Sequence, residues 1–377
     1  MRFSRRSFCK LLSTATGLKW ANALTVGTDV FDSILPEAGG FVELDRNENA
    51  YGSSTKVIDA IQCSAKLANR YARVERDSLA NAIAQFHRVD REEVLLGAGS
   101  TDVLRMAAQA FLGPKRPLIV AEPTFGALEH YARFARAPVI KVPLTRDFAH
   151  DLTAMRDRIS PVTGLVYLCN PNNPTGTLTR SEEIEKFVRS LPVTTPVLVD
   201  EAYHEYAAGA SGAYASFVHQ ARGNHRLVVL RTFSKVYGLA GLRLGYAVGA
   251  PQTLAPMRAV AAEDSINSIV VRAGLAALDS QDAVDEWIKR NDDDRQEFFN
   301  QATARMLKPI DSHTNFVFME TLRPAEVVLQ HFRQHRIHLG PKFPSMPNHV
   351  RISLGIPEDM AQFWRVWDLL PRIDMSM

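Results

Sequence analysis

Cysteine is scarce in this sequence, and its scarcity argues against a disulfide framework. The 377 residues include three cysteines, Cys9, Cys63 and Cys169, and their spacing matches neither a Cys-x-x-Cys motif nor a metal-ligand pattern. So few cysteines in so long a chain are not typical of a disulfide-stabilised scaffold. The eleven histidines show no metal-ligand spacing either. We therefore expect free thiols and no metal site.

The sequence also lacks an excess of charge of one sign and long apolar runs. Its 44 lysines and arginines nearly balance 41 aspartates and glutamates, and the basic residues are scattered rather than clustered. Nothing therefore indicates a surface for nucleic acid or for a membrane. No stretch approaches the roughly 20 consecutive apolar residues of a transmembrane helix. What remains is an ordinary globular composition, long enough for about two domains, that favours a protein acting on small molecules.

The N-terminal residues differ in character from the rest of the chain. The stretch MRFSRRSFCKLLSTATGLKWANAL has paired arginines, Arg5 and Arg6, then a modest apolar run and an Ala-Asn-Ala triplet that ends at Ala23. This order resembles a twin-arginine export signal with its cleavage site. We predict a signal peptide at residues 1–23 and an exported, periplasmic protein. The alternative is a basic N-terminal arm on a cytoplasmic protein, which Lys19 in the apolar run favours.

From about residue 77 to residue 250, short apolar runs alternate with helical patterns. The runs are EVLLGAG, RPLIVAEP, APVIKVPL, GLVYLCN, TPVLVDEAY, HRLVVLRTF and LGYAVGA. Strands rich in Val, Leu and Ile that alternate with helices are typical of βαβ units around a buried, mostly parallel sheet. The sequence therefore predicts an α/β fold, with a large domain at residues 71–262 whose sheet is flanked by helices.

The pattern changes after Pro251. Long helices are expected around 268–279 and 281–306, followed by separate strands at TNFVFM and HVRISLG with a helix on either side of the second strand. We predict a smaller α+β C-terminal domain at residues 263–377. Residues 24–70 carry turn signals and one helix, and we expect this N-terminal arm to pack on other parts of the chain or on another subunit.

Polar residues and glycines collect where the predicted strands end, and in a sheet of this kind those ends border a common crevice. In chain order they are Gly97 to Thr101 (GAGST), Pro123 to Phe125, Asn170 to Gly176 (NPNNPTG), Asp200 to Tyr203 (DEAY) and Ser234-Lys235. These residue types suit a phosphorylated pyridine aldehyde as cofactor. Such a molecule requires a reactive amine, a carboxylate at its ring nitrogen, donors to its ring oxygen, a phosphate site and an aromatic face.

The sequence offers a candidate for each of these tasks. Lys235 is the amine and Asp200 is the carboxylate, each directly after an apolar strand. The remaining candidates are Asn173 and Tyr203 for the ring oxygen, Gly99, Ser100, Thr101, Ser234 and Arg243 for the phosphate, and Phe125 for the aromatic face. Each assignment alone has an ordinary structural alternative, such as a turn for Asn173. Five complementary groups at successive strand ends are hard to explain by chance.

The motifs that carry this chemistry resemble those of a known family. LDRNENAYG (44–52), NRYARVERDSLANAIA, NPNNPTG, DEAY, TFSKVYGLAGLRLGY and VRISLG are similar to fold-type I pyridoxal-phosphate-dependent aminotransferases of class I and II, and most to the histidinol-phosphate aminotransferase group. The resemblance implies transfer of an amino group between an L-amino acid and a 2-oxo acid. It implies that Lys235 holds the cofactor as an aldimine and moves a proton, with Asp200 and Tyr203 as further catalytic residues.

The resemblance also implies roles for residues outside the strand ends. Tyr71 would reach the cofactor phosphate of the neighbouring subunit in a homodimer with shared active sites. Arg351 would clamp the substrate carboxylate, a task that suits the planar guanidinium group. Tyr51 and Asn173 would border the substrate.

Two departures from the family pattern bear on the substrate. Histidinol-phosphate aminotransferases usually carry an arginine before the final strand, whereas this chain has Gly340-Pro341-Lys342, which puts histidinol phosphate in doubt. Glu263 and Asp264 stand where relatives have proline and an aromatic residue, and we hypothesise that they favour a cationic side chain. A lyase, decarboxylase or cyclase acting on a polar or guanidino amino acid is the alternative, and a non-catalytic exported solute-binding protein is a more distant one.

Overall fold

The computed structural model describes residues 40–210 and 212–371, apart from the side chains of residues 73 and 74. The chain divides into two compact units, Met1–Phe41 and Val42–Met377, and the second contains every helix and strand described. The predicted signal peptide at residues 1–23 lies outside the described residues, so it stays a prediction. Of the helices described, none has the length and apolar character needed to cross a membrane.

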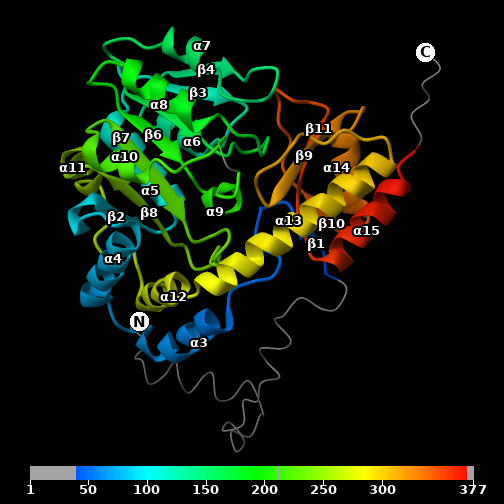
Figure 1. Cartoon of the computed structure of the whole chain (residues 1–377), viewed down its shortest axis with the longest axis horizontal. Helices are drawn as coiled ribbons and strands as arrows, with labels where there is room; N and C mark the ends of the chain where they lie inside the picture. Colours follow the sequence, from blue (N-terminus) through cyan, green and yellow to red (C-terminus); the bar gives the residue numbers. More distant parts are fainter. Residues whose placement is uncertain (1–39, 211, 372–377) are drawn as a thin grey trace, which may run out of the picture. The chain divides into compact units, whose positions relative to one another are not determined.

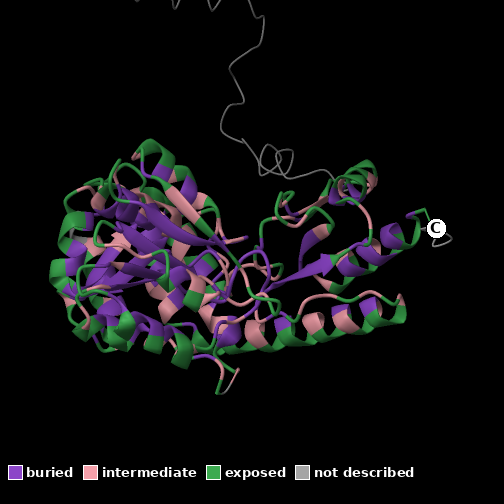
Figure 2. Ribbon diagram, turned by 90° about the horizontal axis from the view of Figure 1, so that it is seen from above, coloured by how far each residue is buried: buried purple, intermediate pink, exposed green. Residues whose placement is uncertain are grey.

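A mostly parallel sheet of seven strands forms the centre of the larger part of this unit (Figure 1). Its strands, in spatial order, are β2 (Val94–Gly97), β8 (Gly245–Gly249), β7 (Leu227–Thr232), β6 (Val197–Asp200), β5 (Leu165–Cys169), β3 (Leu118–Glu122) and β4 (Val139–Pro143). Only β8 runs antiparallel to its neighbours. Most strand residues are buried, as Figure 2 shows, which explains their apolar sequences.

Helices cover both faces of this sheet, because the strand side chains alternate between two apolar cores. In β5, Leu165, Tyr167 and Cys169 belong to one core, and Val166 and Leu168 belong to the other. The first core is completed by α5 (Ser100–Phe111), α6 (Ala127–Phe134) and α11 (Pro251–Arg258). The second core includes α3 (Thr55–Ser64), α4 (Arg73–His87), α7 (Leu152–Arg156), α8 (Ser181–Ser190), α10 (Val218–Gly223) and α12 (Ser268–Leu278).

Two short sheets and three helices form a smaller α+β part of the unit. β9 (Phe316–Glu320) pairs antiparallel with β11 (His349–Ser353), and β1 (Val42–Leu44) pairs parallel with β10 (Ile337–Leu339). The helices are α13 (Gln281–Ala304), α14 (Ala325–Gln334) and α15 (Pro357–Asp368). Aromatic residues of the three helices, Phe298, Phe332 and Phe363, pack together with ring centroids 4.9 to 5.9 Å apart in two of the pairs. This packing forms a third core.

The sequence-based expectations match most of these elements. All seven predicted strands of the large sheet are present, and the helices expected around 268–279 and 281–306 are α12 and α13. β1 and β10 were not predicted. α12 packs on α3 and α4, so the region predicted as the C-terminal domain contributes one helix beside the large sheet. The domain boundaries themselves stay predictions.

Candidate active site

The carboxyl ends of β5, β6 and β7 open into one cavity. The register places Cys169 of β5 opposite Asp200 of β6, and Asp200 opposite Leu230 of β7. The cavity has a volume of about 1,020 Å³. Most of the predicted site residues line it: Ser100, Thr101, Phe125, Asn173, Asp200, Tyr203, Ser234, Lys235, Arg243 and Arg351. The fold therefore brings together side chains that are up to 251 positions apart, from Ser100 to Arg351.

Asp200 is a buried carboxylate with defined partners. It ends β6, is 2% exposed, and accepts a hydrogen bond of 2.8 Å from the Tyr167 hydroxyl and one of 3.1 Å from the Ala202 backbone N–H. Burial raises the pKa of Asp200 to about 6, and the hydrogen bond from Tyr167 opposes this rise. Asp200 can therefore hold a negative charge at neutral pH and accept a further hydrogen bond from a cationic ring nitrogen.

Lys235 follows β7 in a turn that requires glycine at position 238. Gly238 has a φ of 69°, and a Cβ atom there would lie 2.6 Å from the backbone of Gly52. The Lys235 amine donates to the backbone oxygens of Arg46 and Asn47, each at 3.0 Å. Burial, and then the positive charge of Arg351, lower the pKa of Lys235 to about 7. A substantial fraction of this amine is therefore neutral, and nucleophilic, near neutral pH.

The start of α5 and Arg243 form an anion-binding cradle. Gly99 precedes the helix with a φ of 81°, and a Cβ atom there would lie 2.4 Å from Nη2 of Arg243. Arg243 lies 3.4 Å from the Ser234 hydroxyl and 3.5 Å from the Thr101 hydroxyl. Backbone N–H groups at a helix start, two hydroxyls and a guanidinium suit a phosphate.

Tyr203 connects the large sheet to the smaller part of the fold. Its hydroxyl accepts hydrogen bonds from the side-chain amides of Asn47, at 2.9 Å, and Asn173, at 3.4 Å. Asn47 is held in turn by Ser353 of β11, whose hydroxyl donates to its side-chain oxygen at 3.0 Å. Because both amides donate to Tyr203, its own proton remains available for the ring oxygen of a cofactor.

Arg351 is a buried cation with donor capacity that faces the cavity. It is 7% exposed, donates to Oδ1 of Asn173 at 2.7 Å and to the backbone oxygen of Asp45, and its Nε has no partner. The guanidinium lies 5.7 Å from the ring centroid of Phe316 and 5.9 Å from that of Phe343. Arg351 lines the cavity, so its positive charge would stabilise a carboxylate bound there.

The structure differs from the prediction for Tyr51, which does not line the cavity. Its hydroxyl donates to Oδ2 of Asp294 at 2.7 Å, and its ring stacks on Trp287 with centroids 5.6 Å apart. Both partners belong to α13. The role of Tyr51 beside the substrate therefore stays a prediction.

Four further residues singled out from the sequence lie apart from the cavity. Tyr71 is 77% exposed, and Glu263 and Asp264 are also exposed. Lys342 pairs with Glu326 at 2.5 Å. A role for Glu263 and Asp264 in selecting a substrate side chain therefore receives no support from the position of either residue within one chain.

Sequence reasoning missed two residues that support the site, Asn47 and Tyr167. Asn47 lies inside the quoted motif LDRNENAYG, and its motif membership was the only available signal. Tyr167 stands in the apolar run GLVYLCN, where it looks like a core residue. A tyrosine in the middle of a fully buried strand is nevertheless a signal, because its hydroxyl needs a partner.

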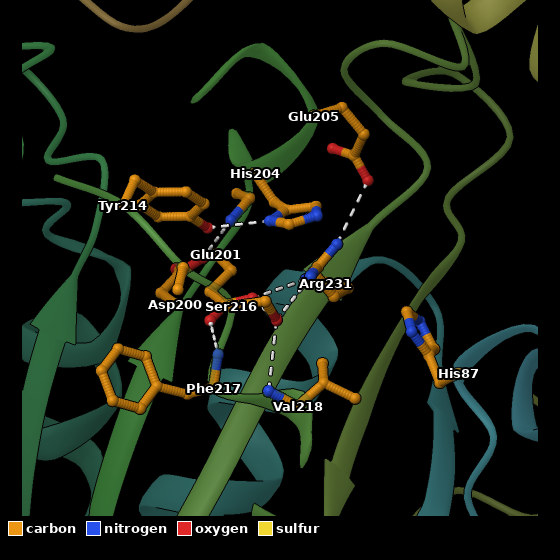
Figure 3. Close-up of polar contacts among 12 residues, drawn as sticks. His87, Asp200, Glu201, His204, Glu205, Tyr214, Ser216, Phe217, Val218 and Arg231 are labelled. Carbon is orange, nitrogen blue, oxygen red and sulfur yellow. Dashed lines mark hydrogen bonds and ion pairs between the residues drawn. The ribbon is translucent and has the colours of Figure 1, made fainter. Parts of the chain in front are cut away.

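A buried ionic network surrounds Arg231, and sequence reasoning missed it as well (Figure 3). Arg231 of β7 pairs with Glu201 at 2.8 Å and with Glu205 at 3.4 Å. Ser216 donates to Glu201 at 2.8 Å and accepts from Arg231 at 2.9 Å. Because Glu201 follows Asp200 directly, this network fixes the ends of the two strands that carry Asp200 and lead to Lys235.

The residues of the cavity fit pyridoxal phosphate. The cradle at Gly99 and Arg243 has no room for a Cβ atom, and it suits the phosphate. Asp200 and Tyr203 suit the ring nitrogen and ring oxygen, and Lys235 is an amine with a lowered pKa. Among the described residues, no group of three or more His, Cys, Asp or Glu side chains is arranged to hold a metal ion.

Comparison with known proteins agrees with this chemistry. The family described as aminotransferase class I and II matches residues 40–365. A histidinol-phosphate aminotransferase of Staphylococcus carnosus is 34% identical over 84% of this chain and 87% of its own length. That of Moorella thermoacetica is 33% identical over 86% of this chain and 84% of its own.

The fold is also similar to that of a solved aminotransferase structure. The histidinol-phosphate aminotransferase of Sinorhizobium meliloti, in complex with pyridoxal 5'-phosphate, is 25% identical, has a TM-score of 0.81, and is matched over 94% of this chain and 97% of that one. The expectation of a fold-type I enzyme similar to histidinol-phosphate aminotransferases is thus confirmed. The chain belongs to the class I and II aminotransferase family and is a pyridoxal-phosphate-dependent aminotransferase.

Proposed function

We propose that Lys235, Asp200 and Arg351 are the central residues of this aminotransferase. In this proposal Lys235 holds the cofactor, Asp200 pairs with its ring nitrogen, and Arg351 binds the carboxylate of an L-amino acid. The observation that carries the proposal is the convergence of the three charged side chains on one cavity that also contains the anion cradle. Bound pyridoxal phosphate supplies an electron sink that stabilises negative charge at the substrate Cα.

The proposed work of the chain is to orient the substrate and to move one proton. Arg351 fixes the carboxylate, and Asn173, which bonds Arg351, keeps the guanidinium in place. Lys235 in its neutral form accepts the proton from Cα, and as an ammonium group it returns that proton. Its pKa of about 7 suits both directions, because neither form is strongly disfavoured at neutral pH.

We infer that the substrate is an amino acid rather than a phosphate monoester. Histidinol phosphate is the substrate in the names of the similar bacterial enzymes. In this chain the stretch 340–342 contributes Pro341 to the cavity lining, whereas Lys342 pairs with Glu326. Apart from the residues proposed for the cofactor, the cations in the described lining are Arg351, inside the cavity, and Arg46, which is exposed. One buried guanidinium suits a single substrate carboxylate.

We also infer a homodimer in which Tyr71 reaches the cofactor phosphate of the neighbouring subunit. The side chain of Tyr71 is 77% exposed, which is unusual for a large aromatic residue next to a helix that packs on the sheet. A partner subunit would cover it. The family resemblance of the motif NRYARVE supports the same role.

The function can be tested by locating the cofactor on the protein. We expect purified protein incubated with pyridoxal phosphate and reduced with borohydride to carry the cofactor on the peptide that contains Lys235, as measured by mass spectrometry. Unreduced protein should convert at least one L-amino acid to its 2-oxo acid, in preference to histidinol phosphate, and should then aminate a second 2-oxo acid.

The matched control is Lys342→Ala, which removes a lysine that does not line the cavity. It should keep both cofactor attachment and transamination, whereas Lys235→Ala should lose both. Attachment at another lysine, or no attachment at all, would show that the proposed role of Lys235 is wrong. Release of carbon dioxide or of the side chain without transfer of the amino group would favour the lyase alternative.

A further inference from the structure

Tyr167 stands out because its hydroxyl serves no purpose in packing. The side chain has no exposed area and lies in the middle of β5 between valine and leucine residues. A phenylalanine would fill the same space, and a buried hydroxyl without a partner would be destabilising. The hydroxyl donates to Oδ2 of Asp200 at 2.8 Å. The hydrogen bond to Asp200 is therefore the role that accounts for a tyrosine rather than a phenylalanine at this position.

The strand register accounts for this contact. Tyr167 pairs with Leu198 and Cys169 pairs with Asp200 on the neighbouring parallel strand. Side chains two residues apart share a face of the sheet, so Tyr167 lies one step behind Asp200 on the same face, and its long ring reaches forward. The contact thus approaches Asp200 from within the core, and it leaves the cavity side of the carboxylate open.

We propose that Tyr167 is a positioning residue that holds Asp200 as an oriented, charged carboxylate, so that Asp200 accepts a hydrogen bond from the cofactor ring nitrogen and leaves the proton on that nitrogen. The proposal rests on the proposed function, in which Asp200 is the partner of the ring nitrogen. A proton shared between two bases stays on the more basic one. A hydrogen bond donated to the carboxylate makes Asp200 the weaker base, which favours the protonated ring.

Other groups around Asp200 do not take over this task. The titratable side chains that act on it are Tyr167, Cys169, Glu201, Tyr203, Tyr214 and Lys235. Of these, Tyr167 alone donates a hydrogen bond to the carboxylate among the described residues. The negative charge of Glu201 opposes the charge on Asp200, and Glu201 is itself paired with Arg231.

The test is Tyr167→Phe in the holoenzyme loaded with pyridoxal phosphate labelled with ¹⁵N in the ring. We expect the ¹⁵N resonance to move toward that of unprotonated pyridine. We also expect kcat for transamination to fall about tenfold, as for loss of a hydrogen bond to a charged group, with KM within about twofold of wild type. A variant that carries 3-fluorotyrosine at position 167, a stronger donor of the same shape, should move the resonance in the opposite direction.

Tyr214→Phe is the matched control, because it also removes one buried hydroxyl, which bonds His204 at 3.0 Å rather than Asp200. It should leave the ¹⁵N resonance unchanged. If Asp200→Asn moves the resonance but neither change at position 167 does, the inference is wrong and the role proposed for Asp200 stands. If Asp200→Asn leaves the resonance of the bound cofactor unchanged, that role fails, and the inference fails with it.

Discussion

At the scale of the residue, burial changes the reactivity of two groups of opposite charge. Burial raises the pKa of Asp200 to about 6 and lowers that of Lys235 to about 7. Each shift disfavours the charged form, because both groups leave water for a cavity. At pH 7 and above the carboxylate is therefore charged while at least about half of the amine is neutral. An ordinary lysine, with its pKa near 10.5, would be almost wholly protonated at pH 7.

The lowered pKa of Lys235 predicts how the rate of cofactor attachment depends on pH. Attachment of pyridoxal phosphate requires the neutral form of the Lys235 amine. We expect the rate for cofactor-free protein, followed by stopped-flow absorption, to rise with pH and to level off above a midpoint of about 7. Arg351→Met removes a positive charge that disfavours the ammonium form, so the midpoint should move to higher pH.

A continued tenfold rise per pH unit up to pH 9 in the wild-type protein would contradict this prediction, since it would indicate an unperturbed amine. Arg272→Met serves as a control for the loss of a positive charge. Arg272 lies on α12 and pairs with Glu75 at 2.7 Å, away from the cavity. Its replacement should leave the midpoint where it is in the wild-type protein.

The residues that the sequence could and could not predict differ in where their partners come from. Lys235 and Asp200 follow apolar strands, where a charged group is conspicuous without any knowledge of the fold. Tyr167 and Asn47 have partners, Asp200 and Tyr203, that are more than 30 positions away. Only the strand register and the approach of the two parts of the fold reveal these contacts. The contacts of Tyr51 were not predicted, because nothing in its motif indicates that Trp287 offers a stacking surface.

At the scale of the element, the start of α5 depends on close approach of the backbone to Arg243. We predict that Gly99→Ala raises the Kd for pyridoxal phosphate at least about tenfold, since the added methyl group would displace the guanidinium from the cradle. Gly99 has a φ of 81° and a ψ of 162°, a conformation almost confined to glycine, which adds a cost of about 1–3 kcal/mol for an L-residue. Fluorescence titration of cofactor-free protein measures the Kd, and thermal unfolding measures the cost.

Gly113→Ala tests the specificity of this effect beyond the other end of the same helix. A Cβ atom at Gly113 would have no neighbour within 4 Å. We expect this variant to bind the cofactor like the wild-type protein. Equal binding by Gly99→Ala would mean that Arg243 and the start of α5 do not hold the phosphate.

Whole elements and the mostly parallel sheet were predictable from long patterns, but the one strand that departs from the parallel arrangement was not. The run LGYAVGA has the apolar character of its neighbours, yet β8 is antiparallel to β7, because the segment between them, which carries Lys235, contains no crossover helix. The apolar composition of a strand indicates that it is buried, but it does not indicate whether the strand runs parallel or antiparallel to its neighbours. β1 and β10 escaped prediction because each has three residues, and they pair across 295 positions of sequence, from Val42 to Ile337.

At the scale of the whole molecule, the site is assembled from distant segments held together by side-chain amides. Asn315 donates to the backbone oxygens of Asn47, at 3.0 Å, and Glu48, at 2.9 Å, and Asn47 contacts both Tyr203 and Ser353. The segment that contains Asn47 thus contacts both the large sheet and the smaller part of the fold. In the proposed homodimer, Tyr71 adds a residue from a second copy of the chain to each site.

Mixing two inactive variants tests whether sites are shared between subunits. In the proposed dimer Tyr71→Ala damages the partner's site, whereas Lys235→Ala damages the site of its own subunit. A hybrid of the two then has one site with both defects and one intact site. After unfolding and refolding an equal mixture, half the dimers should be hybrids, and about a quarter of all sites should regain activity. Phe134→Ala, which removes another exposed aromatic side chain, should be active without mixing. If native mass spectrometry detects the hybrids and no activity returns, Tyr71 acts within its own subunit or not at all.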